Sequence, residues 1–326
     1  MNSNGWVRFR RVVLLMVSGC LLVPGALVRA QEYPARAVNL VVPQSAGGQA
    51  DILARVLAEQ MSKLLNQPVT VLNRDGAAGT IGVTAVKEAA ADGYTIGFGT
   101  QGPFTIQPQL RKALRYAVDD FEFLCQTNTS VLVVVVGPNS SYLSLKELLD
   151  AARKAPGTIT MGSIGVGSGP HLVGEAIAQK AEVKFNHIPF RSIPDLNAQL
   201  IGGGIDVMVT TPTLLETYKT VRPLAVAAAQ RLPSHPDVPL LSQLGFVRGT
   251  VPGFMGVYGP KGLQTGVSTR LRQACDAAAH APNFVATSDR LGSPAQYADN
   301  TAYSQKITQD LSAMTELMRA LAIKPE

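Results

Sequence analysis

The sequence predicts an α/β protein of two lobes, each a mostly parallel sheet flanked by helices. From Ala37 onward, short β-rich apolar runs alternate with amphipathic helical stretches, which is the pattern of βαβ units. Glycine-rich turns follow several of the predicted strands. Removing an N-terminal leader of 30 residues leaves 296 of the 326 residues, more than one typical domain contains. Two lobes of this kind would form a cleft between them.

The first thirty residues have the pattern of a secretory signal peptide. Arginines precede an apolar run from Val12 to Leu22, and small residues end the segment at 28–30. Glycine and proline interrupt the run, so it falls short of the ~20 apolar residues of a spanning helix. We expect cleavage after Ala30 and a freely diffusing periplasmic protein. The alternative is a lipoprotein anchored at Cys20, since residues 17–20 resemble a lipobox, although residues 21–23 remain apolar.

The charge balance gives little support to a nucleic-acid partner. The whole chain has a formal net charge of +6, but four of its 29 basic residues and none of its 23 acidic residues lie within 1–30. The mature chain therefore carries 25 basic and 23 acidic residues, a net charge of +2. No block of lysines and arginines remains in it. We expect no nucleic-acid partner.

Two cysteines, Cys125 and Cys275, remain after cleavage of the leader. An oxidising compartment permits a disulfide between them. They lie far apart in the sequence and in different kinds of segment, so we expect two buried free thiols.

The first βαβ unit is clear from the residues. A strand over 38–42 and a turn over 43–49 precede a helix from Asp51, whose acidic side chain suits a first helical turn. We expect further strands at 69–73, 94–99, 131–136, 158–162, 183–188, 205–209, 224–228 and 254–258. We expect helices at 145–154, 171–180, 194–201 and 268–279, and a long closing helix over about 294–322.

No flexible linker divides the chain. Apolar strands resume near Ser130 and Pro252 after polar or glycine-rich stretches. We therefore expect a first lobe from residues 31–130 plus 252–326 and a second lobe from residues 131–251, with the chain crossing between them.

Three glycine-rich turns, over 43–51, 99–102 and 162–171, follow predicted strands. Ligands of open α/β sheets bind at the carboxyl ends of strands, and a helix that starts there presents unpaired backbone N–H groups. Neutral donors accompany the glycines at Ser45, Thr100, Gln101, Ser163 and Ser168. Any one turn can be an ordinary strand-to-helix connection. The three together favour a site for a small anion.

Enzyme signatures are weak. Residues 97–102 match G-x-G-x-x-G, but Gly97 falls inside a predicted strand, and Pro103 and Pro108 interrupt the region where the required helix would begin. Residues 161–165 lack the first glycine of a nucleophile elbow. The four histidines have no metal-ligand spacing, so we expect neither a metal nor a cofactor. An α/β hydrolase that uses Ser168 and His171 remains as an alternative.

Arg191 follows a predicted strand, where a guanidinium can bind a carboxylate through two hydrogen bonds. The other interpretation is an ordinary ion pair with Asp195 or Asp206, and both stay open. Asp206 lies at a buried strand and is expected to have a structural role.

The sequence resembles the periplasmic solute receptors of tripartite tricarboxylate transporters, known as TctC-like or Bug-type receptors. The matching pieces occur in order along nearly the whole mature chain. They are Tyr33-Pro34, Val42-Pro43, Gly47-Gly48, Asp51, residues 67–69, 73–74 and 91–94, Gly99-Thr100, residues 155–157, His171-Leu172, Gly174-Glu175, Gly203, residues 206–208, 236–239 and 323–326.

The resemblance implies a two-lobe venus-flytrap fold of type II-like topology and no enzymatic activity. It also implies a monomer that holds a small carboxylate in its cleft and delivers the ligand to membrane permease subunits. Backbone N–H groups and bridging waters would recognise the carboxylate. The residues expected to bind the ligand are Ser45, Ala46, Gly47, Gly48, Thr100, Gln101, Ser163, Gly167, Ser168, His171, Phe190, Arg191 and Thr210. A ligand sensor for a signalling partner remains an alternative to transport.

The chain departs from the family's pattern near the expected cleft. Residues 44–46 replace the usual aromatic and proline residues, and Ser192 stands where glycine is common. Thr210 stands where an aspartate is frequent, and Met255 where tryptophan is frequent. The missing carboxylate at Thr210 would either admit a second acid group of the ligand or suit an uncharged one, and both interpretations stay open.

Overall fold

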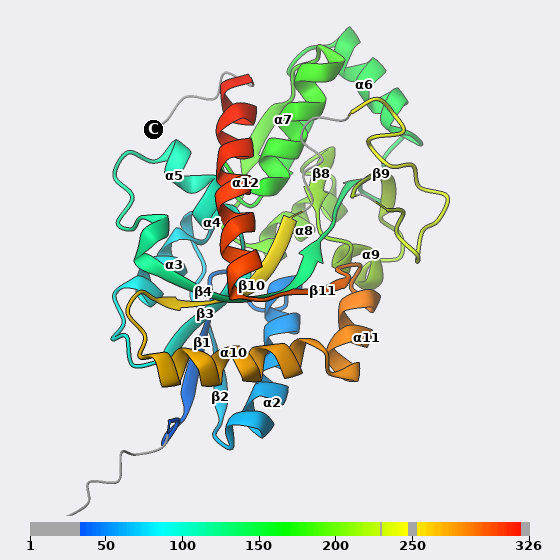
Figure 1. The fold of residues 1–326 in the computed structure, drawn as a ribbon. Coiled ribbons are helices and arrows are strands. Elements are labelled where there is room, and N and C mark those ends of the chain that lie inside the picture. The colour runs from blue at the N-terminus through cyan, green and yellow to red at the C-terminus, as the bar shows by residue number, and fades with distance from the viewer. Residues whose placement is uncertain (1–32, 229, 247–252, 321–326) are drawn as a thin grey trace, which may run out of the picture. The chain divides into compact units, whose positions relative to one another are not determined.

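The computed structural model describes residues 33–228, 230–246 and 253–320. The expected signal peptide, its cleavage site, Cys20, the closing residues 323–326 and the expected lobe boundary at 251–252 lie outside these ranges. The described residues form two sheets flanked by helices, so the predicted α/β two-sheet class is confirmed (Figure 1).

The larger sheet has six strands in the order β11-β4-β10-β3-β1-β2. β1 pairs in parallel with β2 and β3, whereas β10 is antiparallel to β3 and β4, and β11 is antiparallel to β4. Its strands are β1 (Val38–Val42), β2 (Val69–Asn73), β3 (Thr95–Thr100), β4 (Phe121–Ser130), β10 (Gly253–Pro260) and β11 (Ala295–Ala298).

The smaller sheet has five strands in the order β7-β6-β8-β5-β9. β6 is parallel to β7 and β8, and β5 is antiparallel to β8 and β9. Its strands are β5 (Leu132–Val136), β6 (Thr160–Ser163), β7 (Asn186–Pro189), β8 (Val207–Thr210) and β9 (Arg222–Ala227).

Both sheets are therefore mixed rather than mostly parallel. Parallel pairing holds for strands that a helix connects on one face of the sheet, such as β1 and β2 or β6 and β7. The pairing of β4, β5 and β10 with their neighbours is instead antiparallel. β4 leads through a single residue to β5 in the other sheet, and β10 returns the chain to the larger sheet after the strands of the smaller sheet. Without a crossover helix, nothing requires neighbouring strands to run the same way.

Helices cover both faces of each sheet. In the larger sheet, α2, α10 and α11 cover one face and α3, α4 and α12 the other; in the smaller sheet, α6 and α7 cover one face and α8 and α9 the other. The helices are α2 (Gln49–Leu65), α3 (Thr80–Lys87), α4 (Gly102–Thr105), α5 (Gln107–Leu110), α6 (Leu145–Lys154), α7 (Gly169–Ala181), α8 (Ile193–Gly202), α9 (Thr213–Thr217), α10 (Thr265–Ala279), α11 (Pro282–Arg290) and α12 (Asn300–Ala320), with short 3₁₀ turns at Ala77–Gly79 and Val118–Asp120.

Successive side chains of a strand point to opposite faces of the sheet, so the valines of β5 contribute to the hydrophobic cores on both faces of the smaller sheet. Val134 and Val136 of β5 pack with α6 and α7, and Val133 and Val135 pack with α8 and α9. All four side chains are almost completely buried. Each contributes roughly 1.5–3 kcal/mol through the hydrophobic effect. Such strands are apolar throughout, which is why the sequence revealed them.

Two strands escaped prediction. β4 contains the buried polar residues Gln126, Thr127 and Asn128, which obscure its strand pattern. Their side chains bond to neighbouring strands and loops, as Gln126 Nε2 does with the Gln296 carbonyl at 2.9 Å. β11 occupies residues that were expected to begin the closing helix, so that helix starts only at Asn300.

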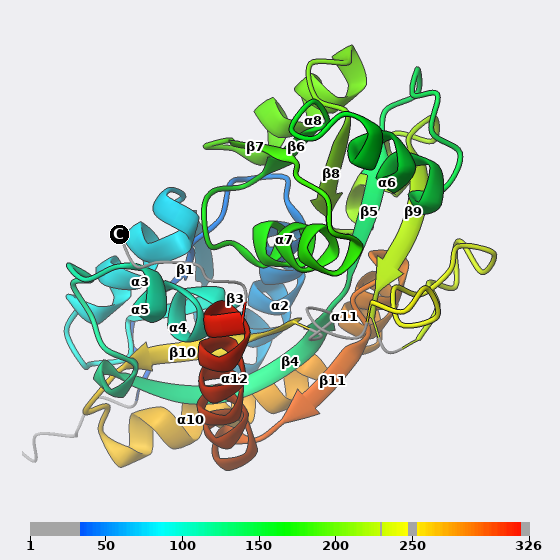
Figure 2. The same ribbon diagram turned by 90° about the horizontal axis from the view of Figure 1, so that it is seen from above.

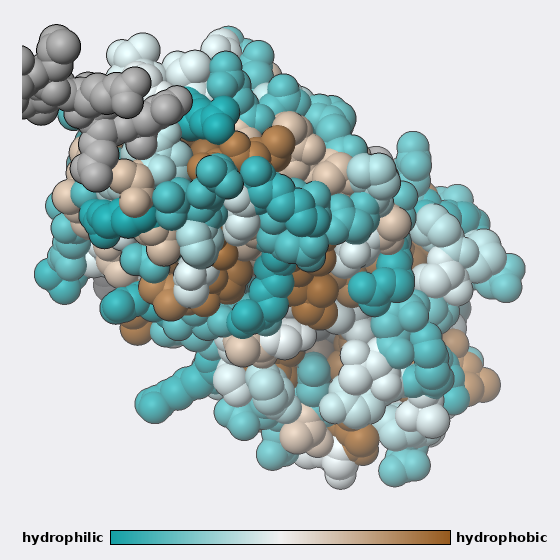
Figure 3. Space-filling model, turned by 90° about the horizontal axis from the view of Figure 1, so that it is seen from below, coloured by the Kyte–Doolittle hydropathy of each residue, from teal (hydrophilic) through white to brown (hydrophobic). Residues whose placement is uncertain are grey.

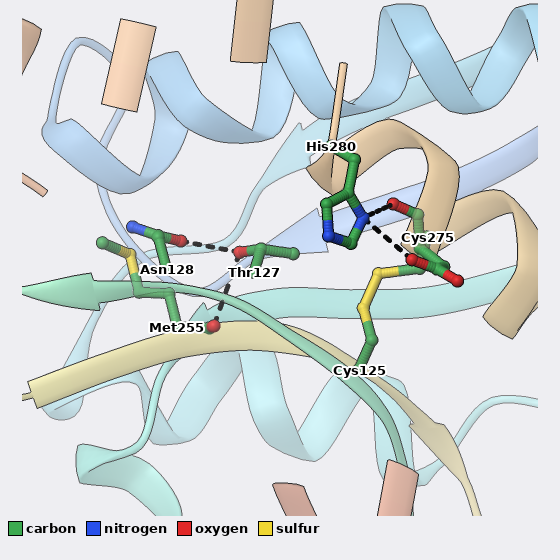
Figure 4. Close-up of a disulfide and its surroundings, with 7 residues drawn as sticks. Cys125, Thr127, Asn128, Met255, Cys275 and His280 are labelled. Carbon is green, nitrogen blue, oxygen red and sulfur yellow. Dashed lines mark hydrogen bonds and ion pairs between the residues drawn. A yellow bond between two sulfur atoms is a disulfide. The ribbon is translucent and has the colours of Figure 1, made fainter. Parts of the chain in front are cut away.

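The expectation of two free thiols is wrong, because Cys125 and Cys275 form a disulfide (Figure 4). Cys125 lies in β4 and Cys275 in α10, and α10 packs directly on β4. Their Cα atoms are 6.5 Å apart, within the range that a disulfide spans. Both side chains are fully buried. Sequence separation gave no sign of this packing.

No helix in the described ranges is long and apolar enough to cross a membrane. The face drawn in Figure 3 is largely hydrophilic, and its apolar side chains form small separate groups. The apolar residues of this chain lie mainly in the cores of the two sheets.

Candidate functional site

A cavity lies where the connections of the two sheets meet. Its volume is about 150 Å³, several times the ~10–15 Å³ that one water requires. Figure 2 shows α7 on the side of the smaller sheet that faces the larger sheet. We call this space the central cavity; its lining is Pro43, Gln44, Ser45, Gly48, Gln49, Ala50, Asp75, Ala78, Gly79, Thr100, Gln101, Gly102, Pro103, Ile106, Ser130, Leu132, Ile164, Gly167, Ser168, Gly169, Pro170, Leu172, Val173, Arg191, Ser192, Ile193, Thr211, Gly253, Met255, Met314 and Leu317.

The first loop, residues 43–48, is held by Asp51 at the start of α2. The Asp51 carboxylate accepts hydrogen bonds from Gly47 N at 2.9 Å, Asn73 Nδ2 at 3.0 Å and Arg55 Nε at 3.1 Å. Burial opposes ionisation of Asp51, but these hydrogen bonds outweigh it and hold the pKa of Asp51 below its ordinary value. The same Asn73 amide donates to the Gln44 carbonyl at 3.0 Å. The loop is thus fixed before any ligand arrives.

The N-terminus of α2 opens into the central cavity without a side-chain cap. Its N-cap is Gly48, which has no side chain to accept the first N–H groups of the helix, and Gln49 and Ala50 line the cavity. α7 and α8 differ, because their N-caps Ser168 and Ser192 accept from backbone N–H groups of their own first turns. The first turn of α2 therefore presents unpaired N–H groups and a positive dipole end to the cavity.

The third glycine-rich turn is held by two stacked imidazoles. Gly167 N donates to His171 Nδ1 at 3.1 Å, and the His171 ring lies 4.1 Å from the ring of His187, centroid to centroid. His187 Nε2 is 2.7 Å from Ser163 Oγ. Burial, together with the nearby His187, lowers the pKa of His171 to about 4. His171 is therefore neutral at pH 7 and able to accept the Gly167 N–H.

Arg191 brings a positive charge to the lining of the central cavity. Among the residues that the structure describes, it forms no ion pair, and the carboxylates expected as alternatives have other partners. Asp195 accepts from Ser192 Oγ at 2.7 Å, and Asp206 accepts from Thr160 N and Oγ1 at 2.7 and 2.6 Å. The predicted structural role of Asp206 is confirmed. Of the two interpretations left open for Arg191, the ion pair with Asp195 or Asp206 is not seen among the described residues.

The expected ligand residues divide into two groups. Those that the structure places in the lining of the central cavity are Ser45, Gly48, Thr100, Gln101, Gly167, Ser168 and Arg191. Those that lie beside it are Ala46, Gly47, Ser163, His171, Phe190 and Thr210. Gly47 is turned toward Asp51, and Ser163 and His171 are buried behind the third turn. Ligand contact stays a prediction for all of them.

Sequence reasoning missed the contribution of α12. Met314 and Leu317 line the central cavity although they come from the closing helix, which also packs against α4. The sequence predicts the closing helix from its hydrophobic spacing, but spacing alone does not say what a helix face contacts. Ser192 and Met255, which depart from the family's pattern, do line the cavity.

The arrangement does not give Ser168 a catalytic base. Ser168 Oγ accepts from His171 N at 3.3 Å as a helix cap, while His171 Nδ1 accepts from Gly167 N. The remaining ring nitrogen, Nε2, lies 3.6 Å from Glu175 Oε1. General base catalysis requires the base to be within hydrogen-bond reach of the proton that it removes. Within the described ranges, no group of histidine, cysteine and carboxylate side chains is arranged to hold a metal ion.

The described residues thus form two mixed sheets whose connections line a cavity, with an open helix N-terminus in its wall, and solved periplasmic binding proteins share this fold. The comparisons with known proteins agree. The profile described as "Tripartite tricarboxylate transporter family receptor" matches residues 53–323. The chain belongs to this family.

Individual relatives extend the comparison. The chain is 32% identical over 269 residues to "UPF0065 protein in tcbD-tcbE intergenic region" of Pseudomonas sp. (strain P51), which covers 81% of this chain and 80% of the relative. The structure titled "Structure of periplasmic binding protein BugD" superimposes with a TM-score of 0.85 at 30% identity, covering 90% of this chain and 100% of that one. "R. palustris Rpa4515 with adipate" has a TM-score of 0.85 at 24% identity, covering 90% and 100%, and shares the fold.

Proposed function

We propose that the protein is a periplasmic receptor that captures a small carboxylate in the central cavity and delivers it to the membrane permease subunits of a tripartite tricarboxylate-type transporter. Membership of the receptor family supports the role. The observation that carries the ligand class is the uncapped N-terminus of α2 in the cavity wall.

A carboxylate matches this part of the cavity chemically. It accepts hydrogen bonds from the first-turn N–H groups of α2, and its charge is favourable at the positive end of the helix dipole. Arg191 adds a cation to the cavity lining, near the contact in which Ile193 N donates to Ser45 Oγ at 3.4 Å. Hydrogen bonds to a charged group contribute about 1.5–3 kcal/mol each.

The remaining parts of the proposal concern export and assembly. We propose cleavage after Ala30, a monomeric mature protein, and lobes divided near residues 130 and 252. Intact mass of the exported protein tests the cleavage site, and a mass that retains an acylated Cys20 contradicts it. Co-purification with a permease or with a signalling protein separates transport from sensing.

A thermal-shift panel of carboxylates on refolded, ligand-stripped protein tests the ligand class. A ligand at a thousandfold excess over its Kd stabilises the folded state by about 4 kcal/mol. We expect a clear rise in melting temperature with at least one acid of the panel and none with its amide. If no carboxylate raises the melting temperature, the proposed function is wrong.

Two variants of the helix cap locate the carboxylate. Gly48→Asp places a carboxylate where it can cap the first turn of α2, so it should be about 1 kcal/mol more stable than Gly48→Ala in the absence of ligand and should weaken ligand binding by about a hundredfold. Gly48→Ala is the matched control, because its Cβ meets the same Ile193 Cδ1, 2.9 Å away, without adding a charge. Equal affinities of the two variants would contradict this placement.

A further inference from the structure

The charges in the wall of the central cavity are few. Among its described lining residues, only Asp75 and Arg191 carry a formal charge. Both are exposed to solvent, and they have opposite signs. The described part of the cavity wall therefore offers one cationic side chain to an acid group of a ligand.

One part of the cavity wall is formed by an apolar cluster. Ile106 lies between α4 and α5, Leu172 belongs to α7, and Met314 belongs to α12; these buried side chains form one cluster, against which Leu317 packs. All four also line the central cavity. Figure 1 shows α12 passing from the larger sheet to the side of α7. We call these four residues the apolar end.

A ligand group at the apolar end loses its hydration and gains no polar partner from these side chains. That transfer is favourable for an alkyl chain or an aromatic ring. It is unfavourable for a carboxylate unless the carboxylate is paired and hydrogen-bonded. Methionine and leucine side chains adapt to irregular apolar shapes. The apolar end thus favours an uncharged body.

The size of the cavity sets the size of that body. The cavity measures about 150 Å³, which equals the volume of an apolar protein cavity that takes up benzene. This volume has to accommodate the carboxylate as well as the body, so it suits a small acid with no more than a single six-membered ring or a short alkyl chain.

We propose that the ligand is a monocarboxylate with one apolar ring or alkyl chain, whose carboxylate lies at the first turn of α2 and whose body lies at the apolar end. This inference rests on the proposed function and makes it more specific. It excludes dicarboxylates and tricarboxylates as preferred ligands.

Matched pairs of acids test the proposal by isothermal titration of the refolded, ligand-stripped full-length mature protein. Hexanoate and adipate share a six-carbon skeleton, and benzoate and terephthalate share a ring; in each pair the second acid adds one carboxylate. We expect the monocarboxylate to bind at least about tenfold more tightly in at least one pair. Less than a tenfold preference for the monocarboxylate in both pairs, or binding of malate or citrate but of none of the four acids, overturns this inference and leaves the proposed function standing. Failure of these four acids and of malate and citrate to bind overturns both.

A charge introduced at the apolar end gives an independent readout. Leu317 is only half-buried, so Leu317→Lys should fold and should shift the preference from the monocarboxylate toward the diacid of the same pair. Ala313→Lys adds the same charge to an exposed position of α12 outside the cavity lining and should leave the preference unchanged. An unchanged preference in folded Leu317→Lys overturns the placement of the ligand body.

Discussion

The pair of stacked imidazoles predicts a loss of stability in mild acid. The perturbation is a decrease from pH 7.5 to pH 5 in the wild type and in His171→Asn. A neutral His171 accepts the Gly167 N–H at Nδ1, and a protonated one cannot. The amide oxygen of asparagine can replace that acceptor and does not titrate.

The magnitude follows from the shifted pKa. Burial lowers the pKa of His171 from 6.5 to about 4, so between these values the unfolded chain binds more protons than the folded protein. The free energy of unfolding therefore decreases as the pH falls through 6.5, and at pH 5 the loss from this group is about 2 kcal/mol. Above pH 7 the group has no effect. Burial lowers the pKa of His187 as well, which adds to the loss.

Urea unfolding of the ligand-free protein at pH 7.5 and pH 5 measures this loss. Burial raises the pKa of the nearby Glu175, which opposes the histidines, so the difference between wild type and His171→Asn is the informative quantity. We expect the variant to lose about 2 kcal/mol less than the wild type. His280→Asn, at an exposed position after α10, is the control. Equal losses in the wild type and His171→Asn would refute the reasoning.

Three other predictions concern stability and covalent structure. The denatured, unreduced mature protein should show no free thiol in a thiol titration, and Cys125→Ala/Cys275→Ala should lower the free energy of unfolding by about 2–5 kcal/mol; two titratable thiols would contradict the disulfide. Gly97→Ala places a Cβ against the Tyr258 ring and should cost about 1–3 kcal/mol in urea unfolding; an unchanged midpoint would contradict this packing. Ser144→Ala removes the side-chain cap of α6 and should cost about 1 kcal/mol; no change would show that water satisfies Glu147 N equally well.

The sequence predicted most elements because hydrophobic periodicity is a local property. The strands Val38–Val42 and Val69–Asn73 have the predicted bounds, and α6 matches its predicted range. β4 was missed for a tertiary reason. Its buried Gln126 and Asn128 are acceptable in a core only because Gln296 and Ser293, more than 160 residues later, bond to them.

The candidate site was predictable where it depends on strand ends. Ser45 and Ser168 belong to turns that follow strands and Thr100 is the last residue of β3, and all three line the central cavity. The apolar end was not predictable, since it requires α12 to pass from the larger sheet to α7. The disulfide was not predictable for the same reason: it depends on how α10 packs on β4.

That disulfide also closes the chain into a covalent ring. The residues between Cys125 and Cys275 include every strand of the smaller sheet, while the bond itself joins β4 to α10 beside the larger sheet. A protease that cuts one peptide bond within the ring releases no fragment until the disulfide is reduced. Nicked molecules would therefore keep both walls of the central cavity on one covalent chain, an advantage for a receptor proposed to work among periplasmic proteases.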